Sequence, residues 1–165
     1  MRPDVGPVPV DRRAVSTHLP DWDYADAYEI AVARPGPDSA MSAAVFLFDL
    51  APLGRATLRI RDAIVRAASL KPALDGTVGL FPVLHATDDF VVLGLDDRHL
   101  DFRVLVDVRS GRVRCTTAVR RHGWSGRAYF GVVAPFHRRV IPHLLARSER
   151  HGWCTPSAAR IATSP

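Results

Sequence analysis

Two histidines and one carboxylate could form a metal site if the chain folds so that they lie together. If residues 80–122 fold as consecutive hairpins, cross-strand pairing places Asp96, His99 and His122 side by side on one face of a sheet. Imidazole nitrogens and carboxylate oxygens are common metal ligands in proteins. A solvated sheet face with cross-strand charge pairs would produce the same row. We favour that second interpretation, and we expect no metal and no other cofactor.

Nucleophilic catalysis has little support in the sequence. Cys115 lies in a run of apolar strand residues, and burial there would disfavour the reactive thiolate. No glycine-rich phosphate loop, zinc-protease helix motif or GxSxG elbow occurs in the chain. Whether the protein is an enzyme is therefore left open, because no motif argues for a reaction.

Three short turns divide residues 80–122 into antiparallel strands. The turns are centred on residues 88–89, 97–98 and 110–111, and each lies between apolar runs. Two-residue loops predict six apolar pairs: Leu84 with Leu93, Leu95 with Leu100, Leu93 with Phe102, Val91 with Val104, Val106 with Cys115, and Phe102 with Val119. The same register places Asp101 opposite Arg120, and Asp107 opposite Arg114, on the other face.

Helices flank this sheet on both sides in the sequence. A strand over 28–33 precedes a helix that Asp38 or Ser39 caps and that runs to Leu50, and a second helix covers 53–70. A long helix over about 125–150 has an apolar stripe formed by Tyr129, Val133, Phe136, Val140 and Leu144. Because proline removes a helical hydrogen bond, we expect a kink or break at Pro135, Pro142 or both.

Length and composition indicate one globular domain. The 165 residues are 47% hydrophobic, enough for a single core. We expect a flexible N-terminal segment over 1–22, the domain over 23–151 and a disordered tail over 152–165. The start of the chain does not resemble a secretory signal, and the longest apolar stretch, Ala43–Phe48, is too short to span a membrane. These features predict a cytoplasmic protein with reduced cysteines.

The charge distribution is uneven. Residues 109–151 contain ten arginines and one acidic residue, Glu149. A basic surface attracts polyanions, but no aromatic side chains alternate with the arginines on a strand. We therefore expect weak, salt-sensitive association with polyanions and no specific nucleic-acid partner. A homodimer is possible.

Three strings of the sequence carry a family resemblance: DYADAYEI at 23–30, GLDDRHLDFRV at 94–104 and PFHRRVIPHLL at 135–145. In this order and at these separations they resemble the DUF2867 family of bacterial proteins. That family is similar to the START and Bet v 1-like (SRPBCC) superfamily, in which a helix-grip fold leaves an apolar cavity between a sheet and a long C-terminal helix. The resemblance implies no particular reaction.

The expected fold is α+β and helix-grip-like, with an antiparallel sheet of five or more strands packed on the long C-terminal helix and two helices after the first strand. The expected function is binding of a small, largely apolar molecule between sheet and helix. The residues expected to line that ligand are Leu93, Phe102, Val104, Cys115, Thr117, Tyr129, Val133, Phe136 and His137. The alternative is a small-molecule enzyme of the cyclase or lyase type, which convergence of a histidine, a tyrosine or an acid on one interior point would favour.

Overall fold

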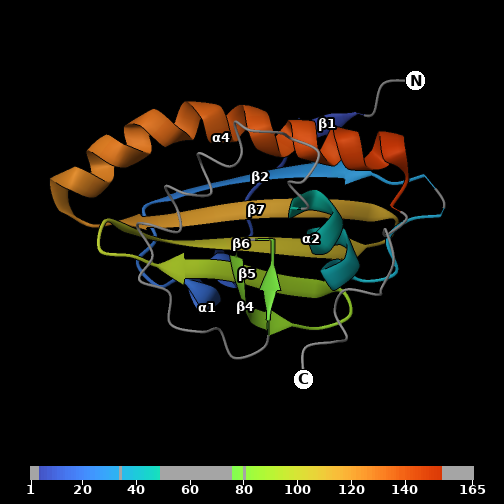
Figure 1. The fold of residues 1–165 in the computed structure, drawn as a ribbon, viewed down its shortest axis with the longest axis horizontal. Coiled ribbons are helices and arrows are strands. Elements are labelled where there is room, and N and C mark those ends of the chain that lie inside the picture. The colour runs from blue at the N-terminus through green and yellow to red at the C-terminus, as the bar shows by residue number, and fades with distance from the viewer. Residues whose placement is uncertain (1–3, 34, 49–75, 80, 154–165) are drawn as a thin grey trace.

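The computed structural model describes residues 4–33, 35–48, 76–79 and 81–153. Its main feature is an antiparallel sheet of seven strands in the order β1-β2-β7-β6-β5-β4-β3 (Figure 1). The strands are β1 (Val5–Pro7), β2 (Tyr24–Ala31), β3 (Thr77–Val78), β4 (Phe81–Ala86), β5 (Phe90–Asp96), β6 (Leu100–Arg109) and β7 (Arg112–Arg121). The described helices are α1 (Arg12–His18), α2 (Ala40–Phe48) and α4 (Gly123–His151). The α+β class and the C-terminal helix are as expected.

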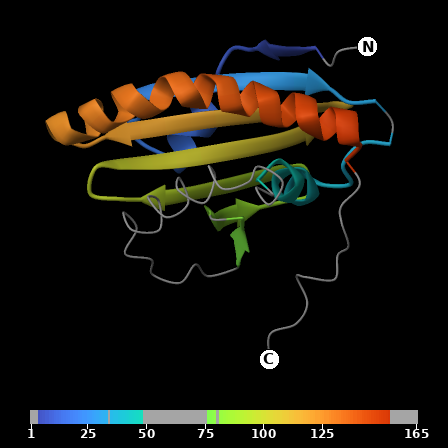
Figure 2. The same ribbon diagram turned by 45° about the horizontal axis from the view of Figure 1, so that its top comes forward.

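The two faces of the sheet carry different layers. On the face that we call the inner face, α2 and α4 pack against strand residues such as Ile30 and Val106. On the outer face, Val15 of α1 and nearby Leu19 pack against Val92 and Leu105. Figure 2 shows α4 lying along the β2 and β7 side of the sheet and α2 lying over its middle strands.

The predicted register is confirmed for β6 and β7. Phe102 pairs with Val119 and Val106 with Cys115, while Asp101 and Arg120 face each other. Asp107 also pairs with Arg114 as expected. Because side chains alternate between faces, this agreement also confirms which side chains of β7 face inward.

The predicted register is wrong at the turn between β5 and β6. Leu95 pairs with Phe102 and Leu93 with Val104, a shift of two residues that leaves the faces unchanged. The turn lies one residue further along the chain, where Asp97 N–H donates to the Leu100 carbonyl at 3.1 Å. The His99 carbonyl accepts from His122 N–H at 2.8 Å, so this turn is fixed against the start of α4.

The register of β4 is also wrong in part. His85 pairs with Val92 as predicted, but Leu93 faces Val83 because the strand has an irregularity between Val83 and His85. The extra residue, Leu84, is 49% exposed instead of facing the core. A bulge of this kind turns one side chain out of the expected alternation.

The predicted histidine and aspartate row does not form. Asp96 faces Asp101 across the β5–β6 pair and forms an ion pair with Arg103 at 2.6 Å. His122 Nε2 lies 3.0 Å from Asp101, while His99 Nδ1 lies 3.2 Å from the Ser125 hydroxyl. Within the described residues, no group of three or more metal-ligating side chains is placed to hold an ion.

Helix α4 begins two residues earlier than predicted and is continuous through both prolines. The expected break is absent, and the helix follows a curved path (Figure 1). Its buried stripe is also shifted from the predicted one. Tyr129 is 46% exposed, so the expectation that it faces the sheet is wrong. The buried residues of α4 are Gly126, Phe130, Ala134, Ile141, Leu144, Leu145 and Ser148.

The remaining predictions concern the ends of the chain and the first helices. Residues 5–7 and 12–18, within the segment expected to be flexible, form β1 and α1. Ser39 and Ser42 exchange hydrogen bonds at the start of α2, as the predicted cap requires. The helix predicted at 53–70, Leu50 and the tail from residue 154 lie outside the described residues. Trp153 is buried.

No described helix is long and apolar enough to cross a membrane.

Candidate functional site

Three polar side chains meet between the sheet and α4. Asp26 on β2 and Thr117 on β7 are direct cross-strand partners on the inner face. His137 reaches them from α4, with its Nε2 atom 3.5 Å from Asp26 Oδ1. We call Asp26, Thr117 and His137 the polar seam.

The polar seam separates two apolar clusters that share the same three elements. Toward the start of α4, Phe130 and Ala134 pack on Val119. Toward its end, Ile141 and Leu145 pack in the cluster that contains Cys115 and Ile30. Along α4, the side chains that face the sheet are therefore apolar, then polar at His137, then apolar again. Along β2 and β7 the seam residues likewise lie between the two apolar clusters. On β7 and α4 the seam residues Thr117 and His137 lie between positions that present apolar side chains, whereas on β2 Asp26 lies between Tyr24 and Tyr28.

The seam contains buried polar atoms that lack a hydrogen bond. Asp26 Oδ1, Thr117 Oγ1 and His137 Nε2 are all shielded from solvent and have no hydrogen-bond partner within the described part of the chain. The side chains of Asp26 and His137 are 16% and 19% exposed, and Thr117 is 5% exposed. Nearly all buried polar groups in proteins are hydrogen-bonded, so three exceptions at one point distinguish this site from an ordinary core.

A tyrosine and an arginine extend the seam toward its rim. The Tyr24 hydroxyl donates to Asp26 Oδ2 at 2.6 Å, and Arg138 Nε donates to the Tyr24 oxygen at 3.2 Å. Burial raises the pKa of Tyr24, and its hydrogen bond to Asp26 raises it further. The phenol therefore stays protonated at neutral pH and holds the Asp26 carboxylate by one oxygen, which leaves the other oxygen unpaired.

Two further groups beside the seam remain neutral. Burial raises the pKa of Tyr28, and the nearby Asp26 charge acts in the same direction. Burial also raises the pKa of the Cys115 thiol well above its usual range. Cys115 is fully buried, so it contributes volume and not a nucleophile, as its surroundings in the sequence predict.

The structure brings together only some of the predicted ligand residues. Thr117 and His137 belong to the seam, and Phe102 is a partly buried neighbour of both apolar clusters. Val133 is half-buried, and Tyr129 faces away from the sheet. Leu93, Val104 and Cys115 are buried in the larger cluster, and the side chain of Phe136 lies outside the described part of the structure.

Asp26 and Tyr24 were not among the predicted site residues. The signal was present in the string DYADAYEI, where Tyr24, Asp26 and Tyr28 alternate with Ala25 and Ala27. In a strand this alternation places the three large polar residues on one face. Because the predicted strand starts at residue 28, the alternation at 24–28 falls outside it.

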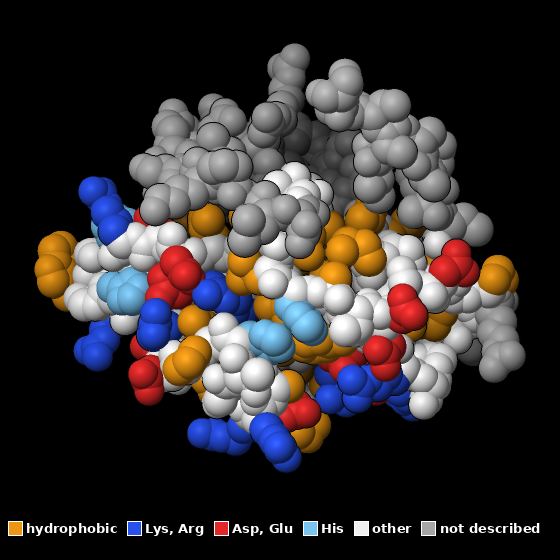
Figure 3. All heavy atoms as spheres, turned by 90° about the horizontal axis from the view of Figure 1, so that it is seen from below, with side chains coloured by type: hydrophobic (Ala, Val, Ile, Leu, Met, Phe, Trp, Pro, Cys, Tyr) orange, Lys and Arg blue, Asp and Glu red, His pale blue; other side chains and the backbone are white. Residues whose placement is uncertain are grey.

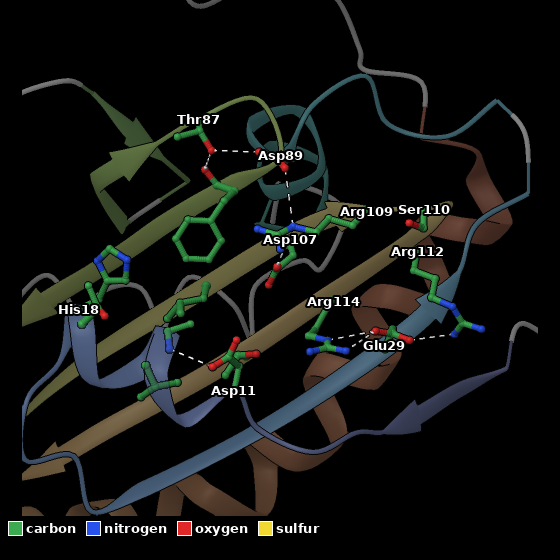
Figure 4. Close-up of a pocket in the computed structure, with 16 residues that line it drawn as sticks. Asp11, His18, Glu29, Thr87, Asp89, Asp107, Arg109, Ser110, Arg112 and Arg114 are labelled. Carbon is green, nitrogen blue, oxygen red and sulfur yellow. Dashed lines mark hydrogen bonds and ion pairs between the residues drawn. The ribbon is translucent and has the colours of Figure 1, made fainter.

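A hollow lies on the outer face, with a volume of about 620 Å³. Its lining includes Glu29, which accepts from Arg112 and Arg114 at 2.8 Å each (Figure 4). Although burial opposes it, these hydrogen bonds lower the pKa of Glu29. Asp107 and Arg109 lie 3.8 Å apart in the same hollow. Acidic and basic side chains also lie next to one another on the surface seen in Figure 3.

In the outer hollow Glu29, Asp89 and Asp107 each lie beside an arginine, whereas three buried polar atoms of the polar seam lack a hydrogen bond within the described residues. A charge that already has a partner within the protein gains little from a ligand, because binding would replace one partner by another. The unpaired atoms of the seam would gain a hydrogen bond. For this reason the polar seam, not the outer hollow, is the candidate functional site.

The fold and the site define an α+β protein whose open antiparallel sheet holds a buried polar seam beneath its C-terminal helix. The chain matches the model of a family described as a protein of unknown function, DUF2867, over residues 18–144, and it belongs to that family. No curated protein and no solved structure matches the chain. The matched region contains all three seam residues.

Proposed function

We propose that this protein binds a small, largely apolar molecule that carries one hydrogen-bonding group, with that group held at the polar seam. The main support for this proposal is the set of three buried polar atoms between the sheet and α4 that lack a hydrogen bond within the described residues. Ligand sites typically combine an apolar lining with a few convergent polar groups. The seam, with an apolar cluster on each side, has this composition.

The chemistry of the seam favours a hydroxyl group on the ligand. Asp26 Oδ1 only accepts hydrogen bonds when ionised, while Thr117 can donate or accept. A hydroxyl can donate to the carboxylate and accept from the threonine or from His137. A ligand carboxylate would instead meet the Asp26 charge at short range, which is unfavourable in a buried site.

The apolar body of the ligand would lie toward the start of α4. In that cluster Tyr24, Leu100 and Phe102 are only partly buried, whereas the cluster on the other side contains many fully buried side chains. The resemblance to the START and Bet v 1-like superfamily, whose helix-grip fold binds ligands between sheet and C-terminal helix, supports this placement.

A comparison of two probes tests the proposal. We expect decanol to raise the melting temperature of the protein and decanoic acid, at equal concentration and neutral pH, to raise it less. The Thr117→Val variant should lose the response to decanol. Thr116→Val is the matched control, because Thr116 is adjacent to Thr117 on β7 but faces the other side of the sheet, where it lines the outer hollow. Equal responses of both variants, or no response of the unmodified protein, would contradict the proposal.

A second candidate function, an acid–base enzyme of the cyclase or lyase type, gains support from Tyr24, Asp26 and His137. A histidine, a tyrosine and an acid converge on one interior point. In a β-hydroxy carbonyl substrate, His137 could remove the α-proton, and the adjacent Asp26 carboxylate would stabilise the imidazolium that forms. The imidazolium would then return this proton to the hydroxyl group as its bond to the β-carbon breaks, so that water leaves and His137 is again neutral. We expect His137→Gln to abolish loss of water from β-hydroxy carbonyl substrates, measured by mass spectrometry, while Thr116→Val, on the other face of β7, keeps this activity. If no such substrate is converted by the unmodified protein, the binding function stands alone.

A further inference from the structure

The outward face of α4 carries apolar side chains in full contact with solvent. Trp124 is 83% exposed and Val132 is 80% exposed. Ala128 and Pro135 are also exposed, and spacings of four, four and three place 124, 128, 132 and 135 on one side of the helix. This stripe is opposite the buried stripe through Phe130 that packs on the sheet. A single exposed apolar side chain is ordinary, but a stripe along one helix face indicates an interaction surface.

The charged side chains that α4 itself presents beside this stripe are arginines. Arg127, Arg138 and Arg139 are exposed on α4 beside or within the stripe, and residues 123–148 include no aspartate or glutamate. In Figure 1 the first turns of α4 lie at the end of the sheet away from β1. A second copy of this helix would bring arginines against arginines, so self-association through this face is disfavoured. An anionic partner is favoured.

We propose that the outward face of α4 docks on an anionic lipid surface, with Trp124 and Val132 inserted at the boundary between head groups and acyl chains. Tryptophan prefers this boundary because its ring is amphipathic, and arginines beside it contact acidic head groups. The stripe lies along one face of a single long helix, so its side chains can enter the same surface together. This inference goes beyond the ligand-binding proposal and does not depend on it.

Co-sedimentation of the full chain with vesicles tests the inference. We expect binding at low ionic strength to an equimolar mixture of phosphatidylcholine and phosphatidylserine, with a blue shift of tryptophan fluorescence. Trp124→Ala and Val132→Asp should each weaken binding about tenfold. Leu84→Asp is the matched control, since Leu84 is also an exposed apolar residue but lies on β4. It should bind like the unmodified protein.

Two charge-reversal variants distinguish docking through α4 from general electrostatic attraction to the vesicle. Arg139→Glu should weaken vesicle binding, while Arg109→Glu, which changes the net charge equally but lies on β6, should leave it nearly unchanged. The inference is overturned if both variants weaken binding equally, or if the unmodified protein does not bind the mixed vesicles. It is also overturned if a mixed-sequence DNA duplex, which offers no apolar layer, binds as strongly as the vesicles. Circular dichroism confirms that each variant is folded.

Discussion

Replacement of Thr117 by valine should stabilise the free protein while removing its ligand binding. Thr117 is 5% exposed, and its hydroxyl has no hydrogen-bond partner within the described residues. Burying an unpaired hydroxyl costs about 1–3 kcal/mol by mutational data. Valine has nearly the same shape and no polar atom, so the substitution should recover about 1–2 kcal/mol of unfolding free energy. For a domain of this size, that corresponds to a rise in Tm of about 2–8 °C.

Urea denaturation, followed by far-UV circular dichroism, measures this change directly. Thr116→Val is again the control, because Thr116 is as buried as Thr117 but faces the outer hollow, and its hydroxyl is not among the buried atoms of the described residues that lack a hydrogen bond. Its unfolding free energy should change by less than about 0.5 kcal/mol. If Thr117→Val instead destabilises the protein by more than about 1 kcal/mol, the hydroxyl has an internal partner. The reasoning about the polar seam would then be refuted.

The remaining predictions concern the core and two carboxylates. Phe102→Ala should cost about 3 kcal/mol in urea denaturation, because Phe102 packs against both apolar clusters; a loss under about 1 kcal/mol would contradict its placement. Hydrogen bonds from His122 and Arg120 outweigh the effect of burial and lower the pKa of Asp101, so its stabilisation is present above the unfolded pKa and is lost as pH falls through the folded pKa. Asp101→Asn should therefore destabilise at pH 7 and have little effect at pH 2. Burial raises the pKa of Asp107, so its ionisation opposes folding as pH rises above the unfolded value. Asp107→Asn should stabilise the protein at pH 7 and lose this effect in acid; destabilisation at pH 7 would contradict the sign.

The sheet could be predicted from sequence wherever short turns and two-face patterning constrain it together. The β6–β7 pair has the glycine turn at Gly111, apolar pairs on one face and charge pairs on the other, and its register is confirmed. The β5–β6 turn lacks a glycine, and its position depends on contact with the start of α4. Gly126 shows this dependence, because a Cβ at this position would clash with the His99 carbonyl oxygen. Such a tertiary contact is not visible in local sequence.

The candidate site could be predicted only in part for a related reason. The β7 register predicts that Thr117 faces the long helix. The position of His137 on that helix predicts that it lies at the margin of the same region. The buried face of α4 is rotated by about one residue from the predicted stripe, since Phe130 and Tyr129 are both aromatic and either fits helical spacing. The choice between them depends on which one meets Tyr24, whose ring centroid lies 4.6 Å from that of Phe130.

The most direct test of the ligand proposal is the position of bound decanol in solution. Nuclear Overhauser effects between decanol and methyl groups of a labelled sample distinguish the two faces of β7, because Thr117 and Val119 face inward while Thr116 and Ala118 face outward. We predict contacts from decanol to the methyl groups of Thr117 and Val119. Contacts to Thr116 and Ala118 alone, or no contact with any of the four, would contradict the proposal.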